Sequence, residues 1–276
     1  MRQLYFYADL GSNHNGDITR AKKLIDAAAE AGCWGVKVQL FSADDIFAPG
    51  FAPEKSIPIL KREWIPELAK HAHAAKLEFG CTIFNPNDMG LIDEHCDYIK
   101  ISSYEMLRTD LLEAANYISL PVHISTGMAT IAEIQTAVHQ IKNKSVVLYH
   151  CCAEYPAPVE RCNIERIKTF QNKIIHDDIR IGWSHHSDSY IPVLSAVAIG
   201  CSHIEIHIDL SDMIGHETKH RHCWIPARLN TTIYMSQQIV KSMQYVSVED
   251  IYKQERLKRA DPIDFRRPYQ SIREKN

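Results

Sequence analysis

The sequence has no hydrophobic run of the length that crosses a membrane, about 18 consecutive apolar residues. Its first segment, MRQLYFYADLG, lacks the long apolar core of a signal peptide. Charge of one sign is also scarce, since the net charge is -3 over 276 residues. These absences argue against a membrane partner, a secreted protein and a nucleic-acid partner, and we expect a cytoplasmic protein.

The eight cysteines lack the CxxC spacing that is typical of zinc and redox sites. Several of them stand inside apolar runs, where cysteine behaves as a small hydrophobic residue. We therefore expect free thiols in a reducing compartment. The chain also has no repeat of 20–50 residues, which argues against a solenoid.

What the chain does have is a regular alternation of apolar, β-rich runs and helical patterns. Positions 18, 21, 24, 25 and 28 form one apolar stripe over Ile18–Ala31, with Asp17 as a potential N-cap. Near-continuous apolar strands between helices are typical of a parallel sheet covered by helices. Eight such repeats in about 210 residues predict an α/β fold, a (β/α)8 TIM barrel over residues 1–246, followed by a charged tail over 247–276. The predicted strands are Leu4–Leu10, Gly35–Leu40, Leu77–Thr82, Tyr98–Ser102, Pro121–Thr126, Ser145–Cys151, Ile179–Ser184 and His203–Ile208, and the other predicted helices are Ile131–Ile141, Ile164–Ile175, Pro192–Ile199 and Asn230–Met243.

In such a barrel the carboxyl ends of the strands carry the active site, together with the loops that follow them. Long loops are predicted after the second and the last strand, over Phe41–Ile57 and Ser211–Pro226. Lys37 and Lys100 stand inside apolar strands, where an ammonium group needs an anion. Lysines with converging hydroxyl groups predict a pocket for a phosphate or a carboxylate. The hydroxyl groups at strand ends belong to Thr82, Ser103, Ser125 and Ser184.

Two histidines end the last two predicted strands, which a segment of helix length connects as a βαβ unit. His186 and His207 should therefore project from one end of the sheet, where two imidazoles can hold a divalent metal and leave positions open. A metal beside an anionic substrate indicates carbonyl chemistry with the metal as Lewis acid. His185 should face the other way, because side chains alternate along a strand. The histidines of the last loop fit a metal cluster and a solvated loop equally well: His216, His220 and His222.

Six segments spread over roughly residues 3–230 form a recognisable set: ADLGSNHNGDITRAKKLIDAAAEAGCWGVKVQLF, YIKISSYE, HISTGMATIAEI, LYHCCAEYPAP, IGWSHHSD and IEIHIDL. In this order they resemble the sialic acid synthase (N-acetylneuraminate synthase) family. The resemblance implies a barrel transferase that condenses phosphoenolpyruvate (PEP) with an aldose such as N-acetylmannosamine. The products would be a 2-keto-3-deoxy sugar acid and phosphate. It also implies a divalent metal, Mn²⁺ or Mg²⁺, that polarises the open-chain aldehyde.

The resemblance also implies roles for individual residues. His186 and His207 would hold the metal. Glu217 stands where a sugar-binding aspartate is usual, and Gln39, Glu105 and Tyr155 would contact the sugar. The phosphate and carboxylate of PEP would be held by Lys37, Thr82, Lys100, Ser103, Ser125 and Ser184. The residues implied to be catalytic are Lys37, Lys100, Glu105, His186 and His207.

The sequence departs from the family pattern mainly on the sugar side of the site. His185 stands where the family usually has an acidic residue before the metal histidine. Cys152 and Ala153 replace a polar pair, and Tyr104 replaces the glycine that usually follows Ser103. We therefore expect PEP condensation with an aldehyde other than N-acetylmannosamine. The chain stops about where the family's C-terminal antifreeze-like capping domain would begin. We expect a homodimer without domain exchange, and a separate protein could supply the cap.

Two other functions fit the same residues. A metal-dependent barrel aldolase or isomerase acting on a sugar phosphate would use the same anion pocket. A non-catalytic barrel that binds a sugar or an anion would also keep the pocket, although the retention of both lysines and both histidines argues against it. Phosphate release that depends on an aldose would separate the synthase from both alternatives.

Overall fold

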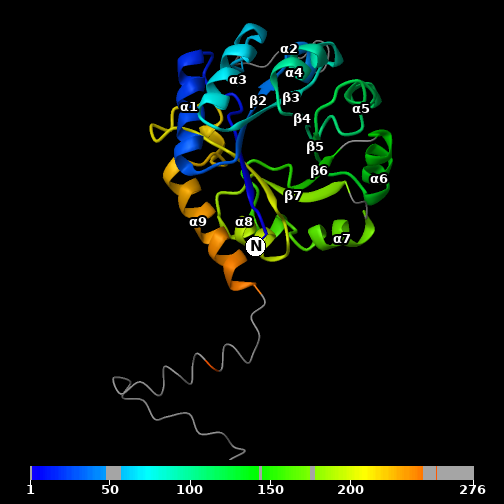
Figure 1. Ribbon diagram of the computed structural model, residues 1–276, viewed down its shortest axis with the longest axis vertical. Coiled ribbons are helices and arrows are strands. Elements are labelled where there is room, and N and C mark those ends of the chain that lie inside the picture. The colour runs from blue at the N-terminus through cyan, green and yellow to red at the C-terminus, as the bar shows by residue number, and fades with distance from the viewer. Residues whose placement is uncertain (1, 48–56, 143–144, 175–177, 245–252, 254–276) are drawn as a thin grey trace, which may run out of the picture.

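Eight parallel strands close into a barrel in sequence order, and helices surround it (Figure 1). The structure is a computed structural model and describes residues 2–47, 57–142, 145–174, 178–244 and 253. The predicted (β/α)8 barrel is confirmed, and each predicted strand agrees with an observed one to within two residues at either end. Apart from Lys253, the predicted tail lies outside the described residues. The strands are β1 (Tyr5–Asp9), β2 (Gly35–Leu40), β3 (Glu78–Ile83), β4 (Tyr98–Ile101), β5 (Val122–Ser125), β6 (Val146–Cys151), β7 (Ile179–His185) and β8 (His203–His207).

The helices form the outer layer. Five of them correspond to predicted helices, and the last begins four residues early, at Pro226, because proline suits the first turn of a helix. A short helix, α2, interrupts Phe41–Ile57, which was predicted to be a loop throughout; residues 48–56 of that segment lie outside the described part. The helices are α1 (Ile18–Ala31), α2 (Ala43–Ile46), α3 (Ile65–Ala74), α4 (Met89–His95), α5 (Thr109–Ala115), α6 (Ile131–Gln140), α7 (Arg166–Lys173), α8 (Ile191–Ala198) and α9 (Pro226–Ser242).

Helix α1 shows how local sequence sets these elements. The Asp17 side chain accepts a hydrogen bond from the backbone N–H of Thr19 at 2.8 Å, which confirms the predicted N-cap. Gly32 ends the helix in the left-handed region at φ 89°, a conformation that glycine adopts without strain. The apolar stripe is buried, and α1 packs beside α9 and α3 (Figure 1).

Aromatic rings fill the barrel interior. The Tyr98 ring stacks on His123 with centroids 4.2 Å apart and meets Tyr7 edge-on at 5.1 Å. Glycine on a neighbouring strand makes room for each tyrosine, because a Cβ atom at that position would collide with the ring. Lys100 Nζ lies 4.6 Å from the centroid of the Tyr149 ring, so the aromatic rings contact the polar residues of the barrel. The glycine and tyrosine pairs are Gly35 with Tyr7, Gly80 with Tyr98 and Gly182 with Tyr149.

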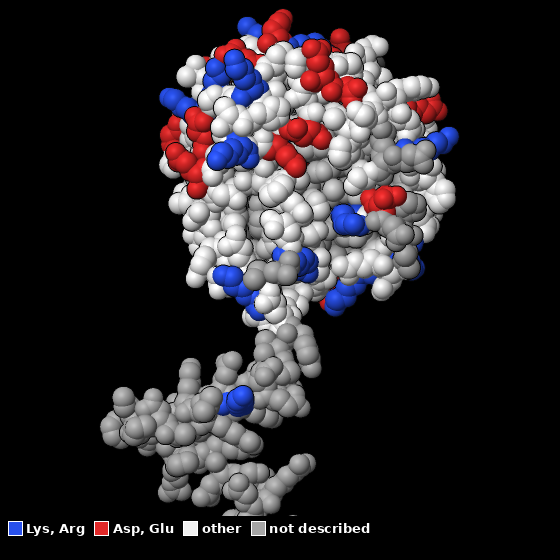
Figure 2. Space-filling view, in the orientation of Figure 1, with Lys and Arg blue, Asp and Glu red and all other residues white. Residues whose placement is uncertain are grey.

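The surface and the cysteines agree with the composition. Acidic and basic side chains are interspersed on the face shown in Figure 2, without one continuous basic area. All eight cysteines are free thiols, as expected. Among the described residues, no helix is both long enough and apolar enough to span a bilayer.

Candidate active site

A cavity of about 630 Å³ opens at the carboxyl ends of the barrel strands. Every side chain that the sequence predicts to bind substrate or metal lines this one cavity. It also receives Asp9 and Glu205, for which the sequence predicted no substrate or metal contact, and His222, which fitted a metal cluster and a solvated loop equally well. The predicted residues that line it are Lys37, Gln39, Thr82, Lys100, Ser103, Glu105, Ser125, Tyr155, Ser184, His186, His207 and Glu217.

Lys37 meets an acidic partner of the chain itself. Its Nζ donates to Asp9 Oδ2 at 2.6 Å and to the Thr82 hydroxyl oxygen at 2.7 Å. Burial lowers the pKa of Lys37, but the carboxylates of Asp9 and Glu205 together raise it by more, so the net shift is upward. Gln39 Nε2 donates to the same Asp9 oxygen at 2.9 Å, which holds the carboxylate in place.

Lys100 has a second acidic partner. Its Nζ lies 2.7 and 2.8 Å from the two carboxylate oxygens of Glu205, and the Ser184 hydroxyl donates to Glu205 at 2.9 Å. Burial would raise the pKa of Glu205, but Lys100 and Lys37 hold it far below its usual range. Burial lowers the pKa of Lys100 more than Glu205 raises it. The lysines were predicted to need an anion, and both receive one from the chain.

The partners have a consequence for charge. The two ammonium groups of Lys37 and Lys100 are balanced by the carboxylates of Asp9 and Glu205, and Glu217 adds a further negative charge at the cavity. A phosphate or carboxylate would thus enter a pocket whose residues carry no net positive charge. A divalent cation would supply the missing positive charge.

The predicted histidine pair lies at one end of the barrel, where His186 directly follows β7 and His207 ends the neighbouring parallel strand β8. The rings of His186 and His207 have centroids 5.4 Å apart. His186 Nδ1 lies 2.8 Å from the Cys152 carbonyl oxygen, which can only accept, so Nδ1 carries the proton and Nε2 keeps its lone pair. Burial and the neighbouring His207 lower the pKa of His186 well below its usual value, so it is a neutral imidazole, the form that binds metals.

His207 is oriented by a carboxylate. Its Nδ1 lies 2.8 Å from Glu217 Oε2, and its Nε2 lies 3.5 Å from Asp9 Oδ2. Metal-binding histidines usually donate the other ring N–H to a carboxylate or a carbonyl group, and both His186 and His207 have such a partner. His185 faces away from the cavity, as predicted, and accepts a hydrogen bond from Trp183 Nε1 at 3.0 Å.

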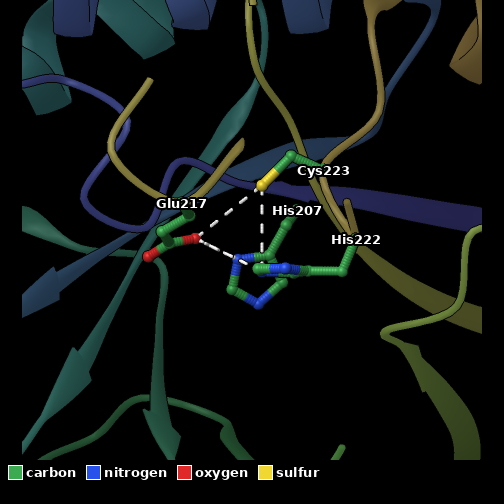
Figure 3. A group of neighbouring side chains, drawn as sticks. All are labelled: His207, Glu217, His222 and Cys223. Atoms are coloured by element: carbon green, nitrogen blue, oxygen red, sulfur yellow. Dashed lines mark hydrogen bonds and ion pairs between the residues drawn. The ribbon is translucent and has the colours of Figure 1, made fainter. Parts of the chain in front are cut away.

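The loop after β8 brings more potential ligands to His207 (Figure 3). His207, Glu217, His222 and Cys223 each have a ligand atom within 4.8 Å of the others. Of the loop histidines, only His222 joins this group: it is 2% exposed, whereas His220 is exposed on the 3₁₀ helix Thr218–His220. Nitrogen, oxygen and sulfur donors of this kind fit a transition metal, and Nδ1 of His222 is buried without a hydrogen-bond partner among the described residues.

Residues near the N-terminus, between β1 and α1 and on α1, hold the loop after β8 in place. Glu217 Oε1 accepts a hydrogen bond from the backbone N–H of Ser12 at 2.8 Å. Arg20 on α1 pairs with Asp209 at 2.6 Å and with Asp212 at 2.8 Å. The contacts fix the loop against the segment that follows β1, so its side chains have a defined position over the cavity.

The cavity also receives the residues that the family resemblance assigns to the sugar. Burial raises the pKa of Glu105 to about 7, and the Ser102 hydroxyl donates to its carboxylate. The Tyr155 ring lies against His186 with centroids 4.3 Å apart. Tyr104, one of the departures from the family pattern, also lines the cavity and is 67% exposed.

The fold and the site define the class first: a TIM-barrel protein with a polar pocket at the carboxyl ends of its strands, built around paired lysines and histidines. Within that class the chain belongs to the NeuB family, whose family model matches residues 24–247. The family resemblance of the sequence is thereby confirmed.

Individual relatives agree with the family. The N,N'-diacetyllegionaminic acid synthase of Campylobacter jejuni is 29% identical over 266 residues, which cover 88% of this chain and 78% of that protein. The spore coat polysaccharide biosynthesis protein SpsE of Bacillus subtilis is 31% identical over 225 residues, 75% of this chain and 60% of that protein. The chain spans 60 to 78% of the length of the curated relatives that it matches.

A solved structure shows the same fold. The N-acetylneuraminic acid (sialic acid) synthetase of Leptospira borgpetersenii, crystallised in complex with citrate, superposes with a TM-score of 0.82 at 26% identity. The match covers 96% of this chain and 93% of that one. The barrel therefore matches that of a named synthetase over nearly its whole length.

Proposed function

We propose that this chain condenses PEP with an open-chain aldose, giving a 2-keto-3-deoxy sugar acid of the sialic acid type and inorganic phosphate. The observation that carries the proposal is that all the residues at the family's substrate and metal positions line one cavity. The printed names of the relatives, which include synthases of legionaminic, pseudaminic and sialic acids, support the same reaction class.

In this proposal the paired lysines receive the two anionic groups of PEP. Lys37 and Lys100 are 2% exposed each, so their charges act in a medium where solvent screens them little. The hydroxyl groups around them add neutral donors without further charge. Those hydroxyl groups belong to Thr82, Ser103, Ser125 and Ser184.

The reaction forms a C–C bond between the methylene carbon of PEP and the aldehyde carbon. Water then adds to C2 of the former PEP and loses a proton. The bond between C2 and the bridging oxygen breaks, so this oxygen leaves with the phosphate and C2 becomes the keto carbon. A divalent metal on His186 and His207, when bound, would supply Lewis acidity to the aldehyde oxygen. Glu105, with a pKa near 7, can carry a proton at neutral pH and give it to the developing alkoxide. Gln39, Tyr155 and Glu217 stay predicted sugar contacts.

The test is turnover of the purified chain with PEP, Mn²⁺ or Mg²⁺ and a panel of aldoses that includes N-acetylmannosamine. We expect aldose-dependent phosphate release and a product whose mass is that of the condensed sugar acid. His207→Ala should abolish this turnover while the circular dichroism spectrum stays that of the wild type. Absence of aldose-dependent phosphate release refutes the proposal, and product from pyruvate or a ketose without PEP favours an aldolase or isomerase.

The expected homodimer stays a prediction, which light scattering of the purified chain would check.

A further inference from the structure

The loop after β8 places a third imidazole beside the two proposed metal ligands. His222 lines the cavity and is 2% exposed. Its ring centroid lies 4.7 Å from that of His207 and 6.3 Å from that of His186. Neither the strand pattern nor the family resemblance gives this residue a role.

The separations of the three ring centres fall in the range that one ion allows. The ligand atoms that lie within 4.8 Å of one another include those of His207 and His222 and do not include one of His186. With a metal–nitrogen bond of about 2.1 Å, the centre of a bound imidazole lies about 3.2 Å from the ion. Two rings on one ion then have centres about 4.5 Å apart at a bond angle of 90° and about 6.4 Å apart at 180°. The three observed separations, 4.7, 5.4 and 6.3 Å, all lie within this interval.

In each ring one nitrogen faces an outer partner and the other has no hydrogen bond within the described part of the chain, with Asp9 Oδ2 3.5 Å from Nε2 of His207. Nδ1 is held in His186 by the Cys152 carbonyl and in His207 by the Glu217 carboxylate. In His222 the nitrogen near Glu217 Oε2 is Nε2, at 3.6 Å, and Nδ1 has no partner among the described residues. A buried imidazole nitrogen without a partner is costly unless a ligand meets it. One carboxylate, Glu217, thus orients two imidazoles in the way that outer partners orient metal ligands.

We propose that His222 is a third nitrogen ligand of the metal, with Glu217 as the positioning residue for His207 and His222. This inference rests on the proposed function in that His186 and His207 are taken as metal ligands. Three imidazoles favour a transition metal ion such as Fe²⁺, Co²⁺ or Zn²⁺ over Mg²⁺, which takes oxygen ligands. Of the two metals that the family resemblance implies, the transition metal ion Mn²⁺ should therefore bind more tightly than Mg²⁺.

The test measures metal affinity directly, without turnover. The full chain is stripped with a chelator, and its dissociation constants for Mn²⁺ and Co²⁺ are measured by competition with a fluorescent chelator. His222→Ala should weaken binding at least tenfold and change the visible absorption bands of the Co²⁺ complex. His216→Ala is the matched control, since His216 belongs to the same loop and is not among the residues that line the cavity, and it should bind within twofold of the wild type. A large excess of Mg²⁺ should not displace the Mn²⁺.

The outcomes separate this inference from the proposed function. If His186→Ala and His207→Ala lose the metal while His222→Ala binds Mn²⁺ and Co²⁺ as the wild type does, His222 is not a ligand and the proposed function stands. If the wild type binds neither ion, or His207→Ala binds both unchanged, the metal role of His186 and His207 fails as well. Should His222→Ala unfold, His222→Gln, which keeps a polar side chain at the position, takes its place, and wild-type affinity of that variant overturns the inference.

Discussion

Replacement of Glu205 by glutamine should destabilise the free protein strongly. Glu205 is 4% exposed and Lys100 is 2% exposed, so Glu205→Gln leaves a buried ammonium group without its counter-charge. Removal of one partner from a buried ion pair typically costs about 3–5 kcal/mol. The Tyr149 ring, 4.6 Å from Lys100 Nζ, remains as a weak partner and places the expected loss near the lower end, about 3 kcal/mol.

The assay is urea unfolding of the wild type, Glu205→Gln, Lys100→Met and the double variant, each without PEP. A loss of about 3 kcal/mol corresponds to a fall in Tm of about 6–12 °C for a chain of this size. The double variant removes both charges. It should be at least about 2 kcal/mol more stable than Glu205→Gln, because replacing a buried ion pair as a whole changes the unfolding free energy little. Single losses below about 1 kcal/mol, or two losses that simply add, would refute the reasoning.

The dependence on pH gives an independent check of the same pair. Without Glu205, burial lowers the pKa of Lys100 further, so the folded protein binds fewer protons at Lys100 than the unfolded protein does. Stability rises with pH when the unfolded state binds more protons. The gap in unfolding free energy between Glu205→Gln and the wild type should therefore narrow between pH 7 and pH 9. A gap that stays constant over this range contradicts a charged, buried Lys100.

Two further predictions concern other parts of the barrel. Burial raises the pKa of Glu105 from 4.5 to about 7. Between these two pH values the folded protein binds more protons at Glu105 than the unfolded protein does. The contribution of Glu105 to the unfolding free energy should therefore fall as the pH rises through this range. Glu105→Gln should flatten this fall in urea unfolding measured at pH 5 and pH 7.5, and an unchanged slope would exclude the perturbed carboxyl. Gly80→Ala should cost about 1–3 kcal/mol, because its Cβ would collide with the Tyr98 ring. The matched Gly90→Ala on α4, which meets nothing within 4 Å, should be neutral or stabilising, and equal losses at the two glycines would contradict the packing argument.

The barrel was predictable because its signal repeats along the chain. Each strand reads as an apolar run with helical periodicity after it, and the pattern needs no knowledge of distant contacts. The prediction began α9 at Asn230, where the apolar pattern becomes clear. The helix begins at Pro226, which the proline indicates and the apolar pattern does not. The short helix α2 was missed because a four-residue element shows no periodicity.

The candidate site was predictable where residues stand at strand ends, and less so elsewhere. Strand alternation alone could have found Glu205, since it lies two residues before His207 and shares its face. Asp9 could have been found at the end of β1 in the same way. His222 was named only together with His216 and His220, as part of a metal cluster or of a solvated loop, because its place beside His207 depends on the path of an irregular loop. No local pattern distinguishes it from the exposed His220.

The pairing of β1 with β8 has a consequence for when the proposed metal ligands can come together. Asn13 Nδ2 donates to the Ile208 carbonyl oxygen across 195 positions of the chain, so this seam joins early and late parts of the sequence. A nascent chain that has emerged only as far as β7 has two open sheet edges and has not yet presented His207 or His222. The ligand group can therefore form only after the last strand has been synthesised and the ring of strands has closed. Metal capture would accordingly report the completion of folding.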